Sequence, residues 1–217
     1  QFVTWDWDYD RTVENAYEIF DACKDAKAKY WGFKEVGIPL DEMKKLCSYM
    51  KACGKTTFLE VVAYTEEECL AGAKMAVECG FDCLMGTIFF DSILDYCKQH
   101  DLRYMPFVGK ITGRPSVLEG TIDGMIEEAN SLLAKGVYGI DLLGYRYTGN
   151  AVELNKRFVA GVKAPVCLAG SVSSYQRLDE VKDADSWAFT IGGAFFENKF
   201  DGTFAEQIDK VVDYMAK

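Results

Sequence analysis

Short apolar stretches alternate with longer amphipathic segments along the whole chain. Stretches rich in branched and aromatic residues begin near residues 2, 30, 56, 81, 103, 137, 164 and 186. Between them, apolar side chains recur at the three- and four-residue spacing of a helix, as in this run: Leu40, Met43, Leu46, Cys47 and Met50. A strand followed by a helix, repeated in this way, predicts parallel strands joined by helical crossovers.

The number of repeats distinguishes between two α/β architectures. Eight strand–helix units favour a closed (β/α)8 barrel, the TIM barrel, over an open doubly wound sheet. No Gly-x-Gly-x-x-Gly motif follows the first predicted strand at residues 2–8, as a dinucleotide-binding open sheet would require. The chain of 217 residues has no low-complexity linker, so we expect a single barrel domain over residues 1–217.

The last two predicted strands both end in small residues. Gly170 and Ser171 follow the seventh strand, and Gly192 and Gly193 follow the eighth. Glycine lets a ligand approach the main chain, and amides beside a helix start attract an anion. Barrels of this kind often bind phosphate at these two loops, so we expect a phosphate-binding site there. The alternative is that the glycines only form turns after buried strands.

Three charged residues lie inside otherwise apolar strands. Lys34, Glu60 and Asp141 occupy such positions, where a charge is costly unless it is paired or belongs to a site. Side chains alternate along a strand, so only one of Lys34 and Glu35 can face the barrel interior, and we choose Lys34. The alternative is an ion pair that only fills the interior. Asp6 is a weaker candidate.

These residues are compatible with two chemistries. A charged Lys34 could stabilise an enolate while Glu60 or Asp141 moves a proton on carbon. A neutral Lys34, or Lys110 in its place, could instead form an imine with a carbonyl substrate and cleave a carbon–carbon bond. We expect no cofactor, although Asp141 and Glu60 could hold Mg²⁺.

Two arginines complete the candidate site. Residues 110–115 read as a glycine-bearing loop that places Arg114 near the substrate, and Arg146 follows the sixth strand. Both are assigned to substrate binding. The only histidine, His100, ends a predicted helix. A single histidine excludes histidine-rich zinc chemistry and argues against a Ser-His-Asp triad.

The charge balance of the chain limits the kinds of molecule that it is expected to bind. The formal charge is -10, from 24 Lys and Arg against 34 Asp and Glu, and no basic run interrupts the acidic excess. Nucleic acid and anionic membranes are therefore poor partners.

No apolar run reaches the roughly 20 residues of a membrane span, and no signal pattern opens the chain, so we expect a cytoplasmic protein. A homodimer is the expected assembly. The eight cysteines form no Cys-x-x-Cys pair and read as buried thiols.

Three segments resemble the ribulose-phosphate-binding barrels, and most of all N-acylmannosamine-6-phosphate 2-epimerases. Residues 137–148 are similar to that family's Gly-x-Asp strand and Gly-Tyr-Thr loop, residues 164–172 to its next strand, and residues 188–195 to its terminal Val-Gly-x-Ala-Ile segment. The resemblance implies a phosphorylated ligand. It also aligns Lys34 with a strand lysine that those epimerases use in proton transfer.

The sequence departs from that family at two catalytic positions. Ala169 stands where the epimerases have a glutamate before the glycine of the seventh strand. Their Asp-Ala-Thr strand has no clear counterpart in residues 58–62, where Glu60 could substitute. The leading hypothesis is an epimerase, isomerase or decarboxylase of a small phosphorylated sugar or hydroxy-carbonyl compound. An imine-forming lyase and a catalytically inactive phosphometabolite-binding barrel are the alternatives.

Overall fold

Eight parallel strands form a closed barrel. The computed structural model describes residues 2–5 and 11–217, and in it the strands are hydrogen-bonded in the order β5-β4-β3-β2-β1-β10-β9-β8. The strands are β1 (Phe2–Trp5), β2 (Tyr30–Lys34), β3 (Thr56–Val61), β4 (Cys83–Gly86), β5 (Arg103–Met105), β8 (Ile140–Leu142), β9 (Val166–Leu168) and β10 (Ala188–Ile191). Residues 6–8, the end of the predicted first strand and the position of Asp6, lie outside the described residues.

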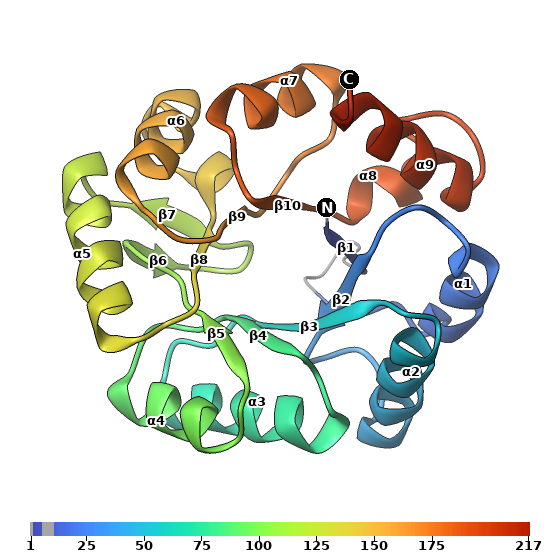
Figure 1. The fold of residues 1–217 in the computed structure, drawn as a ribbon, viewed down its shortest axis with the longest axis horizontal. Coiled ribbons are helices and arrows are strands. Elements are labelled where there is room, and N and C mark those ends of the chain that lie inside the picture. The colour runs from blue at the N-terminus through green and yellow to red at the C-terminus, as the bar shows by residue number, and fades with distance from the viewer. Residues whose placement is uncertain (1, 6–10) are drawn as a thin grey trace.

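Two main-chain hydrogen bonds close the ring between the ends of this order. The N–H of Tyr138 donates to the carbonyl of Tyr104 at 2.9 Å, and the N–H of Asp141 donates to that of Pro106 at 3.0 Å. Figure 1 shows the resulting ring of strands with the helices outside it. The (β/α)8 barrel predicted from the sequence is therefore confirmed.

Helices occupy the amphipathic segments between the strands. They are α1 (Ala16–Cys23), α2 (Leu40–Ala52), α3 (Glu66–Cys79), α4 (Asp91–Gln99), α5 (Ile122–Lys135), α6 (Ala151–Gly161), α7 (Tyr175–Ala184) and α9 (Phe204–Met215). Side chains of Thr65, Thr121, Ser174 and Thr203 each accept a hydrogen bond from an amide of the first turn, which fixes the start of four helices. No helix in the described part of the chain is both long enough and apolar enough to cross a bilayer.

The prediction of a loop over residues 110–115 is wrong in one respect. It belongs to an antiparallel hairpin of β6 (Lys110–Thr112) and β7 (Val117–Glu119). Each of these strands has only three residues, too few for the alternation of polar and apolar positions to indicate a strand. Two short elements were also missed, η1 (Gly144–Arg146) and α8 (Gly193–Phe196), both placed directly after barrel strands.

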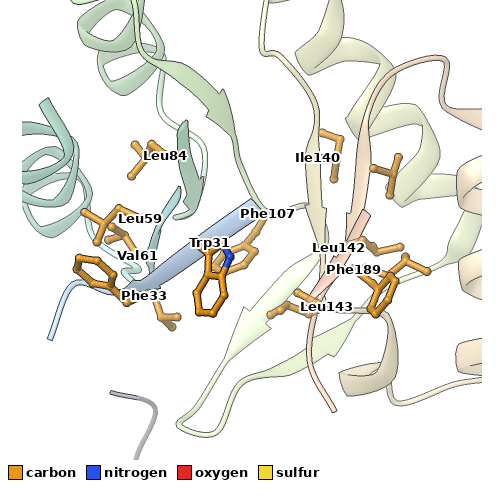
Figure 2. Close-up of a cluster of buried hydrophobic side chains, with 14 of the residues drawn as sticks. Trp31, Phe33, Leu59, Val61, Leu84, Phe107, Ile140, Leu142, Leu143 and Phe189 are labelled. Atoms are coloured by element: carbon orange, nitrogen blue, oxygen red, sulfur yellow. The ribbon is translucent and has the colours of Figure 1, made fainter. Parts of the chain in front are cut away.

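Side-chain alternation sorts each strand into an outer and an inner face. The outward residues pack between the sheet and the helices, as Figure 2 shows for Trp31, Phe33, Leu59, Leu84 and Phe189. A separate cluster comes from the alternate positions of the strands, and its buried members are Phe58, Cys83, Met85, Met105, Cys167 and Ala188. Because successive side chains of a strand point to opposite faces, this second cluster fills the barrel interior.

The cysteines behave as small apolar residues. All eight are free thiols, and seven of them are buried, Cys53 being the partly exposed one. Burial raises the pKa of the Cys47 thiol to about 11, so the reactive thiolate is disfavoured at neutral pH.

Replacing Leu59 with alanine tests the outer core. Leu59 is fully buried between β3 and the helices, so Leu59→Ala is expected to lower the unfolding free energy by about 2–5 kcal/mol through lost burial and the cavity left behind. Denaturant unfolding followed by circular dichroism measures this. Val152→Ala on the exposed surface is the control, and an equal effect of both changes would contradict the assignment.

Candidate active site

A lysine and a glutamate face each other at the carboxyl ends of β2 and β3. The parallel register places Lys34 directly beside Glu60, and both alternate with outward-facing Phe33 and Leu59. Lys34 Nζ lies 3.2 Å from Glu60 Oε1. The two residues are only 3% and 5% exposed, so the pair is shielded from solvent and its attraction is weakly screened.

Asp141 contributes a carboxyl group from β8. It lies between outward-facing Ile140 and Leu142, so its side chain points inward, and it is fully buried. Among the described residues, neither of its carboxyl oxygens has a hydrogen-bond partner. Burial raises the pKa of Asp141 well above its ordinary value, the charge of Glu60 raises it further, and Lys34 partly opposes both. The protonated, neutral form is therefore favoured.

The three predicted catalytic residues on strands thus belong to one electrostatic cluster. Lys34 and Glu60 are in contact, and Asp141 senses both of their charges. The cluster combines a cation, an anion and a neutral acid at the end of the barrel where TIM-barrel enzymes carry their catalytic residues. It can therefore stabilise negative charge and both accept and donate a proton.

The structure gives the Mg²⁺ hypothesis no additional ligand. Within the described ranges, no group of three or more His, Cys, Asp or Glu side chains converges as a metal site would require. Glu60, one of the two proposed ligands, is bonded to Lys34.

Lys110 lies apart from the cluster. Its side chain is 71% exposed on the β6–β7 hairpin, and its Nζ lies 3.4 Å from Oε2 of Glu119 on the facing strand. An amine in this setting is well solvated and gains nothing from the barrel interior, so the geometry gives no support to Lys110 as an imine-forming residue.

Arg114 anchors the hairpin to the end of β3. Its Nη2 donates to the carbonyl oxygen of Val62 at 2.6 Å, and its guanidinium lies 5.6 Å from the ring centre of Tyr64. The hydroxyl of Tyr64 donates to the carbonyl oxygen of Gly113 at 2.8 Å. On the other side, the hydroxyl of Tyr147 donates to the carbonyl oxygen of Gly120 at 2.8 Å. The hairpin therefore connects the regions that follow β3 and β8.

The predicted phosphate loop after β9 has an unusual backbone. Gly170 and Ser171 have φ values of 85° and 58°, so two consecutive residues adopt the left-handed conformation, which is uncommon for serine. A Cβ on Gly170 would lie 3.2 Å from Cγ of Arg146, so the Arg146 side chain lies against this turn. The other predicted pair, Gly192 and Gly193, ends the adjacent β10 and begins α8.

Sequence reasoning missed Arg177, in the first turn of α7. Its guanidinium donates to the carbonyl oxygen of Ser171 and lies 4.7 Å from the ring centre of Tyr145. Arg146 and Arg177 therefore flank the Gly170–Ser171 turn, and neither forms a salt bridge with another described residue. The available signal was an arginine six residues beyond the serine, at the start of the next helix.

Comparisons with known proteins identify the fold. No family model and no curated sequence matches the chain. Orotidine 5'-phosphate decarboxylase from Pyrococcus horikoshii is similar over 100% of both chains, with a TM-score of 0.74 and 13% identity. N-acetylmannosamine-6-phosphate 2-epimerase from Clostridium perfringens has a TM-score of 0.66 and 13% identity over 98% of this chain and 91% of its own.

A third similar structure is a glycerol uptake operon antiterminator regulatory protein from Listeria monocytogenes. Its TM-score is 0.58, with 16% identity over 88% of this chain and 90% of its own. These likenesses define the chain as a (β/α)8 barrel and confirm the resemblance to the epimerase at the level of the fold. The interior of this barrel contains the buried residues Lys34, Glu60 and Asp141.

Replacing Asp141 with asparagine is expected to stabilise the protein. The pKa of Asp141 is higher in the folded protein than in the unfolded chain. As the pH rises above the ordinary value of 3.8, the unfolded chain therefore loses the Asp141 proton first, and the free energy of unfolding falls. This fall continues until the pH reaches the pKa of Asp141 in the folded protein. Asp141→Asn removes this loss, so we expect the variant to gain stability relative to the wild-type protein, and the gain to be larger at pH 8 than at pH 4.5. Denaturant unfolding at both pH values measures it. A loss of stability at pH 8 would contradict the argument.

Proposed function

We propose that this barrel is an enzyme that moves a proton on carbon in a small phosphorylated sugar or hydroxy-carbonyl compound. The observation that carries the proposal is the buried cluster of Lys34, Glu60 and Asp141. An unpaired buried acid beside a buried ion pair is destabilising, and such an arrangement is typical of catalytic sites. Epimerisation, isomerisation and decarboxylation all pass through the same kind of carbanion or enolate.

Each member of the cluster has a role in that chemistry. Glu60 accepts the proton from carbon, the electron pair moves into the adjacent carbonyl to give an enolate, and the ammonium of Lys34 stabilises the developing negative charge. Asp141, held in its neutral form, returns a proton to carbon. Return at the same carbon from the other face gives an epimer. Return at the neighbouring, former carbonyl carbon gives an isomer, provided that the hydroxyl proton of the first carbon passes to the former carbonyl oxygen, so that the first carbon becomes the new carbonyl.

The phosphate group binds at the ends of β9 and β10 in this proposal. Arg146 and Arg177 flank the Gly170–Ser171 turn, and a guanidinium matches the geometry of phosphate oxygens. The names of the decarboxylase and the epimerase with similar folds both include a phosphate ester, which supports a ligand of that class. Gly192 and Gly193 contribute the main chain of the adjacent strand end.

The imine-forming lyase receives less support from the contacts. Imine formation requires a neutral amine, and the bond to Glu60 favours the charged form of Lys34. Borohydride treatment in the presence of a carbonyl substrate separates the two reactions. A covalent adduct on Lys34 would favour the lyase, and turnover without an adduct favours proton transfer.

Deuterium incorporation tests the proposed chemistry. In D2O, phosphorylated aldoses, ketoses and N-acylamino sugars that stabilise the protein against heat are expected to exchange a C–H for C–D, observed by proton NMR. In Asp141→Asn, formation of the epimer or isomer is expected to slow about 100-fold or more while the protein stays folded, because the neutral acid is lost. Exchange at the carbon that Glu60 deprotonates is expected to persist, because Glu60 can return a solvent deuteron to the same face. Asp95→Asn on the exposed face of α4 and Lys110→Met are the controls, and both should retain the rate.

Two outcomes would contradict this assignment. An unchanged rate of product formation in Asp141→Asn would remove Asp141 from the reaction. Thermal stabilisation by phosphorylated compounds without exchange in the wild-type protein would favour the inactive, phosphometabolite-binding barrel. That alternative is consistent with Ala169 at the epimerases' glutamate position and with the regulatory protein that shares the fold.

Replacing Arg146 with glutamine tests the phosphate site. Loss of a charged hydrogen-bond donor beside Gly170 is expected to weaken binding of a phosphorylated ligand about 10- to 100-fold and to leave binding of its dephosphorylated form unchanged. Titration calorimetry measures both affinities. Arg157→Gln is the control, because Arg157 pairs with Glu153 and Asp123 on the outer helices. Equal losses for the two ligand forms would contradict the assignment.

A further inference from the structure

Glu35 is a largely buried carboxyl group that the proposed reaction does not use. It follows Lys34 at the end of β2, and its side chain alternates to the other face of the strand. Its Oε1 accepts a hydrogen bond from the N–H of Val62 at 3.2 Å. Its Oε2 is inaccessible to solvent and has no hydrogen-bond partner among the described residues. A buried, half-satisfied carboxyl group is costly, so its presence at this position calls for an explanation.

The bonds of Glu35 join the two strands that carry the ion pair. Its own N–H donates to the carbonyl oxygen of Glu60 at 3.3 Å, and its side chain binds the amide two residues beyond Glu60. The Lys34–Glu60 register is the last pair of the β2–β3 ladder. Glu35 therefore continues the connection between the strands past the point where the ladder ends, immediately beside the Lys34–Glu60 contact.

We propose that Glu35 is a positioning residue for the Lys34–Glu60 pair. Glu35 holds the ends of β2 and β3 together through its hydrogen bond with the Val62 amide. Proton uptake by Glu35 at the barrel rim thereby changes the environment of the pair. This inference rests on the proposed function, which places the Lys34–Glu60 pair in the active site. Its geometry is independent of which reaction the site performs. In the proposed scheme the side chain of Glu35 does not touch the substrate. Its effect on the reaction therefore passes through the ends of β2 and β3, which carry Lys34 and Glu60.

The charges around Glu35 set the direction of this coupling. Burial raises the pKa of Glu35 to about 7, with Lys34 lowering the pKa and Glu60 raising it. Arg114 reaches the same peptide from the hairpin, where it binds the carbonyl oxygen of Val62. Above neutral pH the ionised Glu35 is the stronger acceptor for the Val62 amide and attracts Lys34. Below neutral pH its charge is lost, and Lys34 interacts with Glu60 without that competition.

Side-chain and amide NMR across a pH series tests the proposal on the full chain without a ligand. In the wild-type protein, the Lys34 Cε–H signal, identified by its loss in Lys34→Arg, and the Val62 amide signal should both show an inflection near pH 7. Glu35→Gln keeps the size and an oxygen acceptor but cannot ionise in this range, so both inflections should disappear while the remaining amide spectrum is retained. Glu127→Gln on the exposed face of α5 is the control and should keep both.

The outcomes separate this role from a purely structural one. A structural role predicts changed stability in Glu35→Gln with no inflection at Lys34 in the wild-type protein, and that result would overturn the proposal. Persistence of the Lys34 inflection in Glu35→Gln would also overturn it, since another group would then be titrating. Because the measurement needs no turnover, a failed deuterium exchange experiment would reject the proposed reaction and leave the NMR result to decide the role of Glu35.

Discussion

The contact between Lys34 and Glu60 is the constraint on which the candidate site depends. Breaking a buried ion pair by removal of one partner typically costs about 3–5 kcal/mol, whereas two apolar residues of similar volume are often as stable or more so. Stability alone is therefore a weak reason for this pair to occupy the barrel interior. Asp141, fully buried and unpartnered among the described residues, adds to the cost. The concentration of unfavourable electrostatics at one end of the barrel is best understood through what the site does.

The barrel was predictable because its signals are local and repeated. Each strand–helix unit has its own apolar pattern, and the right-handed crossover limits the ways in which such units assemble. Local alternation required Lys34 and Glu35 to face opposite sides of the strand, and the pairing of Lys34 with Glu60 in the structure identifies Lys34 as the inward residue. For Asp141, the neighbouring Ile140 and Leu142 are apolar and pack outward, as the alternation requires.

Other features depend on contacts between distant segments and could not be read from the sequence. The position of Arg177 against Ser171 depends on how α7 returns to the sheet, and the bond between Glu35 and Val62 depends on the register of two strands. The hairpin of β6 and β7 has strands of only three residues each, too short for a periodic signal. The sequence indicated which residue types were available, and the tertiary structure determined which of them meet.

The β6–β7 hairpin has a consequence for engineering this scaffold. Its tip is bonded to the segment after β3 through Tyr64 and Arg114, and its base to the segment after β8 through Tyr147. An insertion or a fused tag in the hairpin would therefore disturb the segments after β3 and β8 together. The turn at Gly54, between α2 and β3, is a better attachment point, because a side chain added there meets no other atom within 4 Å. Its left-handed backbone favours keeping the glycine itself and inserting beside it.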